Sequence, residues 1–190
     1  MKTWFTSDLH LGHENVIKYS KRPFATAAEM DEQLIKRWNS VVEKQDAVYI
    51  IGDFSFYKDQ QKAVDVLQRL NGAEKHLVLG NHDKHLKGWV RDKFSSCSPY
   101  REIYVEDPTT VDGKQFLVLS HYSFRVWNKS HYGSINLYGH SHGSLPGTSQ
   151  SLDVGVDCWD YTPCDLQQIK QRLKDFPKFH SDDHHEGREN

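Results

Sequence analysis

The sequence predicts an α/β sandwich formed by a single domain. In the first half of the chain, three short apolar runs alternate with two amphipathic patterns of helical period, which is typical of a parallel sheet with helices on its faces. The second half has mainly β character. No repeat, low-complexity stretch or linker separates the halves, so we expect one domain over residues 1–176, followed by a flexible tail over residues 177–190.

The elements of the first half follow from apolar spacing and from the residues that end each run. Three strands are expected, over residues 3–7, 47–51 and 76–80. Two helices are expected, over residues 27–43 and 58–70. A capping box from Thr26 to Glu29 marks the start of the first helix, and the pair Asn71-Gly72 stops the second.

The second half begins with a predicted β-hairpin. Its two strands, residues 101–106 and 114–120, flank a turn at Asp112-Gly113. The remaining elements are expected to be strands over residues 135–138 and 151–157 and a helix over residues 165–174.

Charge and composition exclude several classes of protein. The 190 residues include 24 Lys and Arg against 26 Asp and Glu, and a net charge of −2 leaves no broad basic surface for bulk nucleic acid. An odd number of cysteines, three, argues against a secreted disulfide framework. No apolar leader or run of 18 apolar residues is present, so we expect a soluble cytoplasmic protein without membrane contact.

Histidine is frequent, with 12 in the chain, and one pair stands out in the stretch LYGHSHG. If this stretch is extended, His140 and His142 point to the same side, because strand side chains alternate between faces. That geometry suits chelation of a metal. The alternative is a polar turn after a strand, and the pair alone does not decide between them.

The rest of the chain favours a metal site, because residues that bind metals follow five predicted strands. These residues are Asp8, His10, Asp53, Asn81, His82, His121, His140 and His142. In open α/β sheets, ligands bind outside the carboxyl ends of the strands, so these loops are expected to converge on one crevice. Each residue alone could be a turn former or a core histidine.

Leaving His82 aside, the donors are two carboxylates, one amide oxygen and four imidazoles, which is too many for one tetrahedral ion. Two divalent ions are therefore expected. Mixed nitrogen and oxygen ligands without thiolate favour Mn, Fe or Zn over Ca or Mg, with manganese expected first. Asp53 is the natural carboxylate to bridge two ions about 3.5–4 Å apart.

The ordered motifs SDLH, GD, GNHD, SH and GHSH resemble those of the calcineurin-like metallophosphoesterase superfamily. The run TSDLHLGHENVIKYSKRPF and the ending DVGVDCWDYTPCDL further resemble a compact bacterial and phage-type branch of it. The resemblance implies an α/β/β/α sandwich with the metal site at the carboxyl ends of the strands. It also implies hydrolysis of a phosphoester by a hydroxide that the two ions share.

Residue by residue, the resemblance assigns Asp8, His10 and His142 to one metal, Asn81, His121 and His140 to the other, and Asp53 to both. It assigns to His82 the protonation of the leaving oxygen.

One departure concerns the run GDFSFYK, which lacks the second acid and the arginine that follow GD in the protein-phosphatase branch. This argues against a phosphoprotein phosphatase. It leaves open which group orients His82, with Asp83 either in that role or as an ordinary turn former.

Additional substrate contacts are expected from His13, Arg22 and Arg125, although each is equally compatible with a solvated surface position. Tyr122 and Trp127 could stack on a nucleobase or simply pack.

We therefore expect a phosphodiesterase that acts on a small or nucleotide-like phosphoester. A phosphomonoesterase and a non-catalytic binding module of the same fold are the alternatives. A nuclease for long DNA would need a basic groove that the sequence does not show. The native metal, the physiological substrate and the oligomeric state do not follow from the sequence.

Overall fold

The structure, a computed structural model, describes residues 1–180 and contains two mixed β-sheets flanked by helices. Among the described residues the strands are β1 Thr3–Thr6, β2 Ala47–Ile50, β3 Glu74–Val78, β4 Ser96–Ser98, β5 Tyr100–Glu106, β6 Lys114–Ser120, β7 Ile135–Tyr138, β8 Ser151–Asp153 and β9 Cys164–Asp165. The α-helices are α1 Glu14–Tyr19, α2 Ala27–Val41, α3 Gln60–Arg69, α4 Gly88–Arg91 and α5 Leu166–Leu173. Short 3-10 turns cover Asp83–His85, Ser130–Tyr132 and Val156–Cys158.

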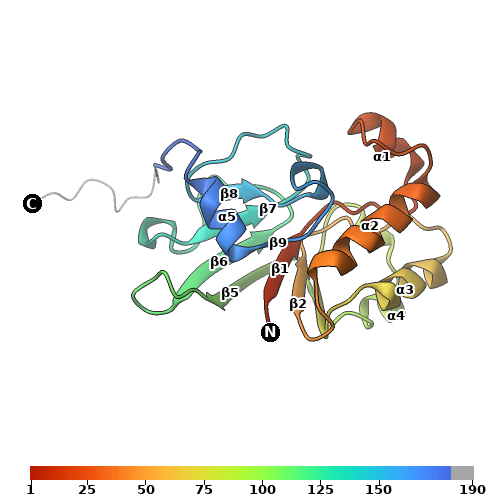
Figure 1. The fold of residues 1–190 in the computed structure, drawn as a ribbon, viewed down its shortest axis with the longest axis horizontal. Helices are drawn as coiled ribbons and strands as arrows, with labels where there is room; N and C mark the ends of the chain where they lie inside the picture. The colour runs from red at the N-terminus through yellow and green to blue at the C-terminus, as the bar shows by residue number, and fades with distance from the viewer. Residues whose placement is uncertain (181–190) are drawn as a thin grey trace, which may run out of the picture.

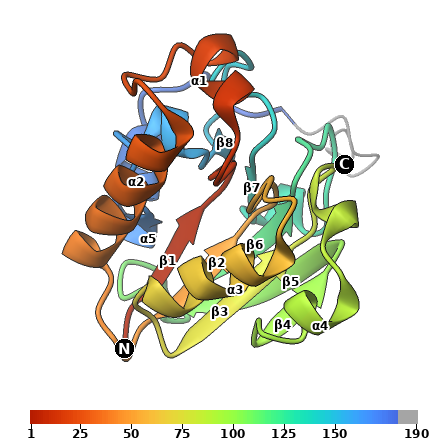
Figure 2. The same ribbon diagram turned by 90° about the vertical axis from the view of Figure 1, so that its right-hand side faces the viewer.

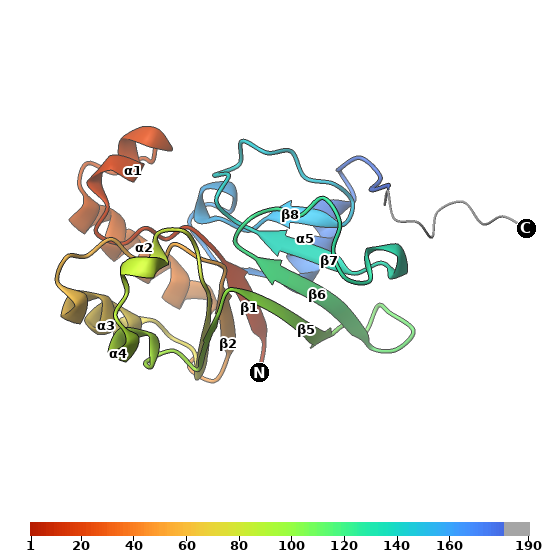
Figure 3. The ribbon, with the colours of Figure 1, turned by 180° about the vertical axis from the view of Figure 1, so that it is seen from behind.

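The first sheet has the order β4-β3-β2-β1-β9, and the second has the order β5-β6-β7-β8. Strands β1 to β4 are parallel, as expected for strands joined by helical crossovers, while β9 is antiparallel to β1. In the second sheet β5 and β6 form the predicted antiparallel hairpin, and β7 and β8 continue it in parallel (Figure 3).

Alternating side chains of the first sheet build two cores. Trp4 points into the cluster formed with α2 and α3, whereas its neighbour Phe5 points into the cluster formed with the second sheet. In Figure 1 the helices α2, α3 and α4 lie on one side of β1 and β2, and strands β5 to β8 lie on the other. The layers match the α/β/β/α sandwich expected from the sequence, with α5 packed on β8 and β9.

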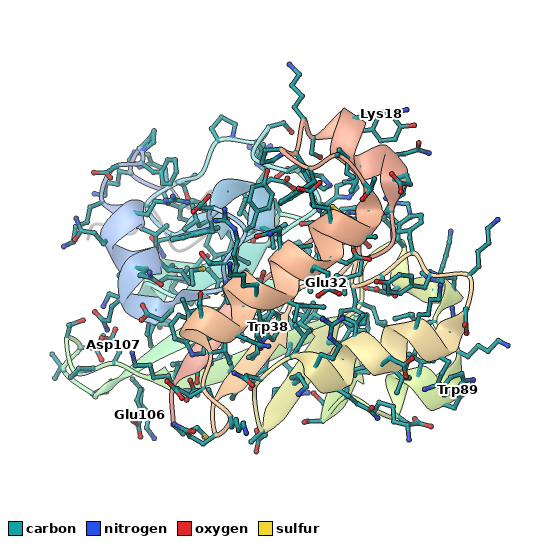
Figure 4. All side chains as sticks on the ribbon, turned by 45° about the vertical axis from the view of Figure 1, so that its right-hand side comes forward. Lys18, Glu32, Trp38, Trp89, Glu106 and Asp107 are labelled. Carbon is teal, nitrogen blue, oxygen red and sulfur yellow. The ribbon has the colours of Figure 1, made fainter. Side chains whose placement is uncertain are left out.

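Helix α2 starts where the sequence predicts. The Thr26 side chain accepts the N–H of Glu29 at 3.1 Å, but the Glu29 carboxylate accepts from Ala25 rather than from Thr26 itself. Further along, Glu32 points toward α3 (Figure 4), where its carboxylate accepts two hydrogen bonds from Arg69. The same view shows Asp107 at the end of the molecule far from α1; there it pairs with Lys170 of α5.

Several elements differ from the prediction. The strand expected over residues 151–157 ends at Asp153, because the Asp153 carboxylate turns the chain by accepting the N–H of Gly155, and a 3-10 turn follows. Helices α1 and α4 and strands β4 and β9 are missed because each is short and lacks a periodic apolar pattern.

The predicted flexible tail begins with residues that make contacts. Phe179 packs on Trp127, and the Pro177 carbonyl accepts a hydrogen bond from Ser149. Residues 181–190 of the predicted tail lie outside the described residues. Within the described part of the chain, no helix combines the length and apolar character needed to cross a bilayer.

Asp83 ties together the loops that follow β2 and β3. Its carboxylate is fully buried and accepts three backbone N–H groups, from Asp53 at 2.7 Å, Phe54 at 2.9 Å and Gly80 at 2.8 Å. Hydrogen bonds to a buried carboxylate are stronger than those between neutral groups. The acid therefore fixes where the two loops meet.

We expect Asp83→Asn to lower the free energy of unfolding by about 2–4 kcal/mol, because an amide NH₂ cannot accept the N–H groups that the carboxylate receives. Denaturant unfolding in the presence of a chelator measures this without a contribution from bound metal. Asp92→Asn, an exposed acid in the same part of the chain, is the matched control. A loss below about 0.5 kcal/mol would show that Asp83 does not hold the loops.

Candidate metal centre

The candidate ligands converge at the carboxyl ends of five strands, β1, β2, β3, β6 and β7. In Figure 2, β1 runs from the N-terminus toward the end of the molecule that carries α1, and the loop with the first ligands follows it directly. Within residues 1–180, two groups of side chains are close enough to hold a metal ion. They are Asp8, His10 and His142 in the first cluster and Asp53, His121 and His140 in the second.

The first cluster turns one oxygen and two ring nitrogens toward a common point. Oδ1 of Asp8 lies 3.7 Å from Nε2 of His10 and 3.9 Å from Nε2 of His142. The other oxygen of Asp8 accepts the backbone N–H of His140 at 2.9 Å. One carboxylate oxygen is therefore used to hold the His140 loop and the other remains for an ion.

The second cluster gains an amide oxygen from Asn81. Nε2 of His121 lies 3.0 Å from Oδ1 of Asn81 and 3.4 Å from Oδ2 of Asp53. On the other side of its ring, His121 donates from Nδ1 to the Ile51 carbonyl at 2.9 Å, which fixes the tautomer that leaves Nε2 available as a ligand.

Asp53 stands between the two clusters. Its Oδ2 lies 3.5 Å from Nε2 of His10 and 3.4 Å from Nε2 of His121, while its Oδ1 accepts the backbone N–H of His82 at 2.9 Å. A single carboxylate oxygen thus faces one histidine of each cluster. This is the placement that a bridging ligand requires.

The buried polar atoms fit a cation. Oδ1 of Asp8 and Nε2 of His10 are buried and have no hydrogen-bond partner, although orphaned buried groups of this kind cost about 1–3 kcal/mol each. Both clusters are consistent with a dinuclear metal site of nitrogen and oxygen donors. The local field also favours positive charge: burial disfavours protonation of His121, yet the hydrogen bond with Asp53 and the charge of Asp8 raise its pKa to about 9.

The backbone at the site is unusual. Five of the seven candidate ligands, Asp8, His10, Asp53, His140 and His142, have φ between 45° and 66°, in the left-handed region. The expectation that His140 and His142 lie in extended backbone is therefore wrong. They reach different clusters because the chain turns at each of them, with Ser141 donating to the Gly139 carbonyl between them.

Gly139 explains how this turn comes so close to the first cluster. A Cβ atom at this position would collide with Oγ of Ser7 and Oδ2 of Asp8. Glycine permits the close approach that lets Asp8 accept the N–H of His140.

Asp157, which the sequence reasoning missed, orients His142. Its Oδ2 accepts from Nδ1 of His142 at 2.6 Å, and both of its oxygens accept from Arg22 at 2.8 Å. A carboxylate behind a metal-binding histidine fixes the ring and raises its basicity. The available signal was its place at the end of the run DVGVD, residues 153–157.

The expected phosphate contact from Arg22 is contradicted by its surroundings. The guanidinium is buried and donates to Asp157, to the carbonyls of Asp8 and Leu9 and to the sulfur of Met30. These contacts use the whole donor set of the guanidinium, so the arginine supports the loop that carries the first ligands.

His82 lies beside the first cluster, with its ring centroid 5.6 Å from that of His10. Burial lowers the pKa of His82, while the charge of Asp53 opposes the shift. No hydrogen bond to the imidazole of His82 is found among the described residues. The carboxylate of Asp83 accepts hydrogen bonds from backbone N–H groups and none from His82. The proposed orienting role of Asp83 is therefore not what the structure shows.

An aromatic contact supports His82 instead. Phe56 from the GDFSFYK run lies 4.6 Å from His82, ring centroid to ring centroid, and stacks in parallel on His13 at 3.8 Å. Nδ1 of His13 in turn lies 3.4 Å from Nδ1 of His10. Burial, followed by electrostatic interaction with the neighbouring His10 and His82 rings, lowers the pKa of His13 to about 4.

The other candidate contacts lie on the loop after β6. Tyr122 is exposed and sits against His140, with centroids 4.6 Å apart, whereas Trp127 is buried and donates to Ser134. Trp127 is thus a packing residue. Arg125 is exposed, and its contact with substrate remains a prediction.

A cleft of about 670 Å³ opens over the first cluster. We call it the metal-side cleft; its walls include His10, His13, Phe56, His82 and His142. Its size falls in the range of small-molecule sites.

Residues 1–155 match the family model of the calcineurin-like phosphoesterases, and the chain belongs to this family. It is 46% identical to an uncharacterized protein of Methanocaldococcus jannaschii, covering 91% of this chain and 92% of that protein. It is 31% identical to the Gene 66 protein of Mycobacterium phage L5, covering 83% of this chain and 87% of that protein.

A solved structure, that of a protein of unknown function from Aquifex aeolicus, shares the fold. The TM-score is 0.67 at 20% identity, with 90% of this chain and 98% of that chain covered. The resemblance noted in the sequence is therefore confirmed at the level of family and fold.

Metal removal should destabilise the protein, because chelation leaves Asp8 and His10 buried without partners. At a manganese concentration about 100 times Kd, we expect the melting temperature to rise by roughly 5–10 °C over that of chelated protein. His10→Ala should abolish most of this shift, and His180→Ala, which changes an exposed histidine that belongs to neither cluster, should retain it. A melting temperature that does not respond to any of Mn, Fe or Zn would contradict a metal site here.

Proposed function

We propose that this protein is a dinuclear, metal-dependent phosphodiesterase of small or nucleotide-like substrates, with two manganese ions as the first choice and iron or zinc as alternatives. The observation that supports it most is Oδ2 of Asp53, which faces His10 of one cluster and His121 of the other at 3.5 and 3.4 Å. Asp8, His10 and His142 would hold one ion, Asn81, His121 and His140 the other, and Asp53 both. When bound, such ions supply Lewis-acid stabilisation of the phosphoryl oxygens and an activated water.

We propose His82 as the proton donor. It lies beside the first cluster and lines the metal-side cleft, where an ester oxygen departing from phosphorus would meet its ring. The negative charge of a bound phosphodiester favours the protonated imidazole. Phe56 restricts the ring by packing, so the donor is positioned by an aromatic contact in place of a carboxylate.

We favour a diester over a monoester as the substrate, because the phosphorus of a diester carries two organic groups. A second hollow of about 500 Å³ shares the walls His82 and Phe56 with the metal-side cleft. The two hollows adjoin at His82 and Phe56, so there is room for an organic group beyond the metal-side cleft. Rates on matched mono- and diesters of the same nucleoside, measured with manganese-loaded protein, test this choice. A monoester preferred over every diester would contradict it.

Asp53→Asn should reduce activity more than loss of either terminal histidine, His140 or His142, because it weakens the binding of both ions. We expect a loss of at least 10³-fold in kcat/KM together with loss of bound metal. The readouts are kcat/KM on a nitrophenyl diester and metal content by elemental analysis. Near-native turnover with two ions retained would show that Asp53 does not bridge.

His82→Ala should leave the metal content intact and slow esters with poor leaving groups far more than activated aryl esters. General acid catalysis contributes roughly 10²- to 10⁴-fold, and only where the departing oxygen needs a proton. The comparison uses a nitrophenyl diester and a nucleoside diester. Equal losses on both would make His82 a phosphate-binding group, and loss of metal would make it a ligand.

A further inference from the structure

The second hollow beside His82 is basic. We call it the lysine pocket; Lys58, Lys84, Lys87, His85 and Gln60 contribute to its walls, together with His82 and two aromatic rings. No aspartate or glutamate of residues 1–180 lines it. The chain as a whole carries a net charge of −2, so a hollow with three lysines and no acid is not the general character of its surface.

The three lysine side chains have no partners in the described part of the chain. None of their Nζ atoms forms an ion pair, hydrogen bond or cation–π contact there, whereas Lys170, for example, pairs with Asp107 at 2.6 Å. The three lysines are exposed, and their positive charges around one hollow attract anions. The pocket therefore favours a negatively charged ligand.

The backbone that carries the lysines is held in place. Lys84 belongs to the Asp83–His85 turn, which the buried Asp83 anchors. The backbone N–H of Lys87 donates to Oε1 of Gln60 at 3.1 Å, and this bond joins the start of α4 to the start of α3. Only the side chains need to order when an anion binds, which limits the entropic cost.

The pocket continues past the residue that would protonate the leaving group. His82 and Phe56 form walls of both hollows, so a substrate whose scissile phosphate lies at the metal clusters extends past His82 on the leaving-group side. An anionic group on that part of the substrate meets the lysines.

We propose that the lysine pocket binds a second phosphate of the substrate, carried by the leaving group of the diester. This inference rests on the proposed phosphodiesterase function and narrows its substrate class to small diesters with a further phosphate, such as a phosphorylated dinucleotide. A long nucleic-acid strand is disfavoured, because the basic residues surround one hollow and the chain has a negative net charge.

The test compares dinucleoside monophosphates with and without one added terminal phosphate, at the 5′ end or the 3′ end. For the native protein with manganese, we expect one of the two phosphorylated forms to have a kcat/KM higher on the order of tenfold, the scale of three partly exposed ion pairs. In Lys58→Gln/Lys84→Gln/Lys87→Gln this ratio should fall to about one. The control Lys36→Gln/Lys44→Gln/Lys114→Gln changes three exposed lysines outside the pocket and should keep the native ratio.

Several results would overturn the proposal. One is that the native protein has the same kcat/KM for the phosphorylated and unphosphorylated dinucleotides. Another is that the variant with all three pocket lysines replaced keeps the native preference for a phosphorylated form. A third is that kcat/KM keeps rising with each nucleotide added beyond the second phosphate. The last result would indicate binding of a strand.

A binding measurement separates this proposal from the proposed reaction. Calorimetric titration with a nucleoside 3′,5′-bisphosphate and with the two monophosphates needs no turnover. Tighter binding of the bisphosphate that depends on the three lysines supports the pocket even if no diester is cleaved, in which case only the proposed reaction fails. Equal affinity of the native protein and the pocket variant for the bisphosphate would overturn the pocket.

Discussion

The structure of the site depends on the burial of two carboxylates, Asp8 and Asp53, at the ends of the paired parallel strands β1 and β2. A buried carboxylate costs several kcal/mol unless it is compensated by charge or hydrogen bonds. Each of these acids accepts one backbone N–H from another loop, at His140 and at His82, and turns its remaining oxygen toward histidine nitrogens. The loops converge because their backbone N–H groups donate hydrogen bonds to these two carboxylates. The carboxylate oxygens that accept no such bond mark where cations would compensate the negative charge.

The convergence of the ligand loops requires a left-handed backbone conformation, which most residues other than glycine avoid. Left-handed φ values at five ligands cost of order 1 kcal/mol or more each, and such strain persists only where the surroundings over-determine it. The surroundings here are polar and buried: Asp83 holds three backbone N–H groups, and Asp157 links His142 to Arg22. These groups do not act on a substrate. They keep the ligands in place before any ion or substrate arrives.

The sequence predicts the alternating strands and helices, the hairpin and the grouping of the ligand residues, because apolar periodicity and strand-end positions are local features. It does not predict the αL turns at His140 and His142, which depend on contacts with Asp8 and Ser7 more than 130 residues away. Arg22 was expected either to contact phosphate or to lie solvated at the surface, and it is buried instead, because it pairs with Asp157, which is 135 residues away in the sequence. The group that orients His82 was left open, with Asp83 as one candidate, and only the packed structure shows that Phe56 contacts the ring of His82.

The central claim is that the two clusters hold a pair of ions that share Asp53. Anomalous diffraction from crystals grown with manganese measures this directly. We expect two peaks about 3.5–4 Å apart, one beside Asp8, His10 and His142 and one beside Asn81, His121 and His140, with the Asp53 carboxylate between them. A single peak, or two peaks without Asp53 in contact with both, would contradict it.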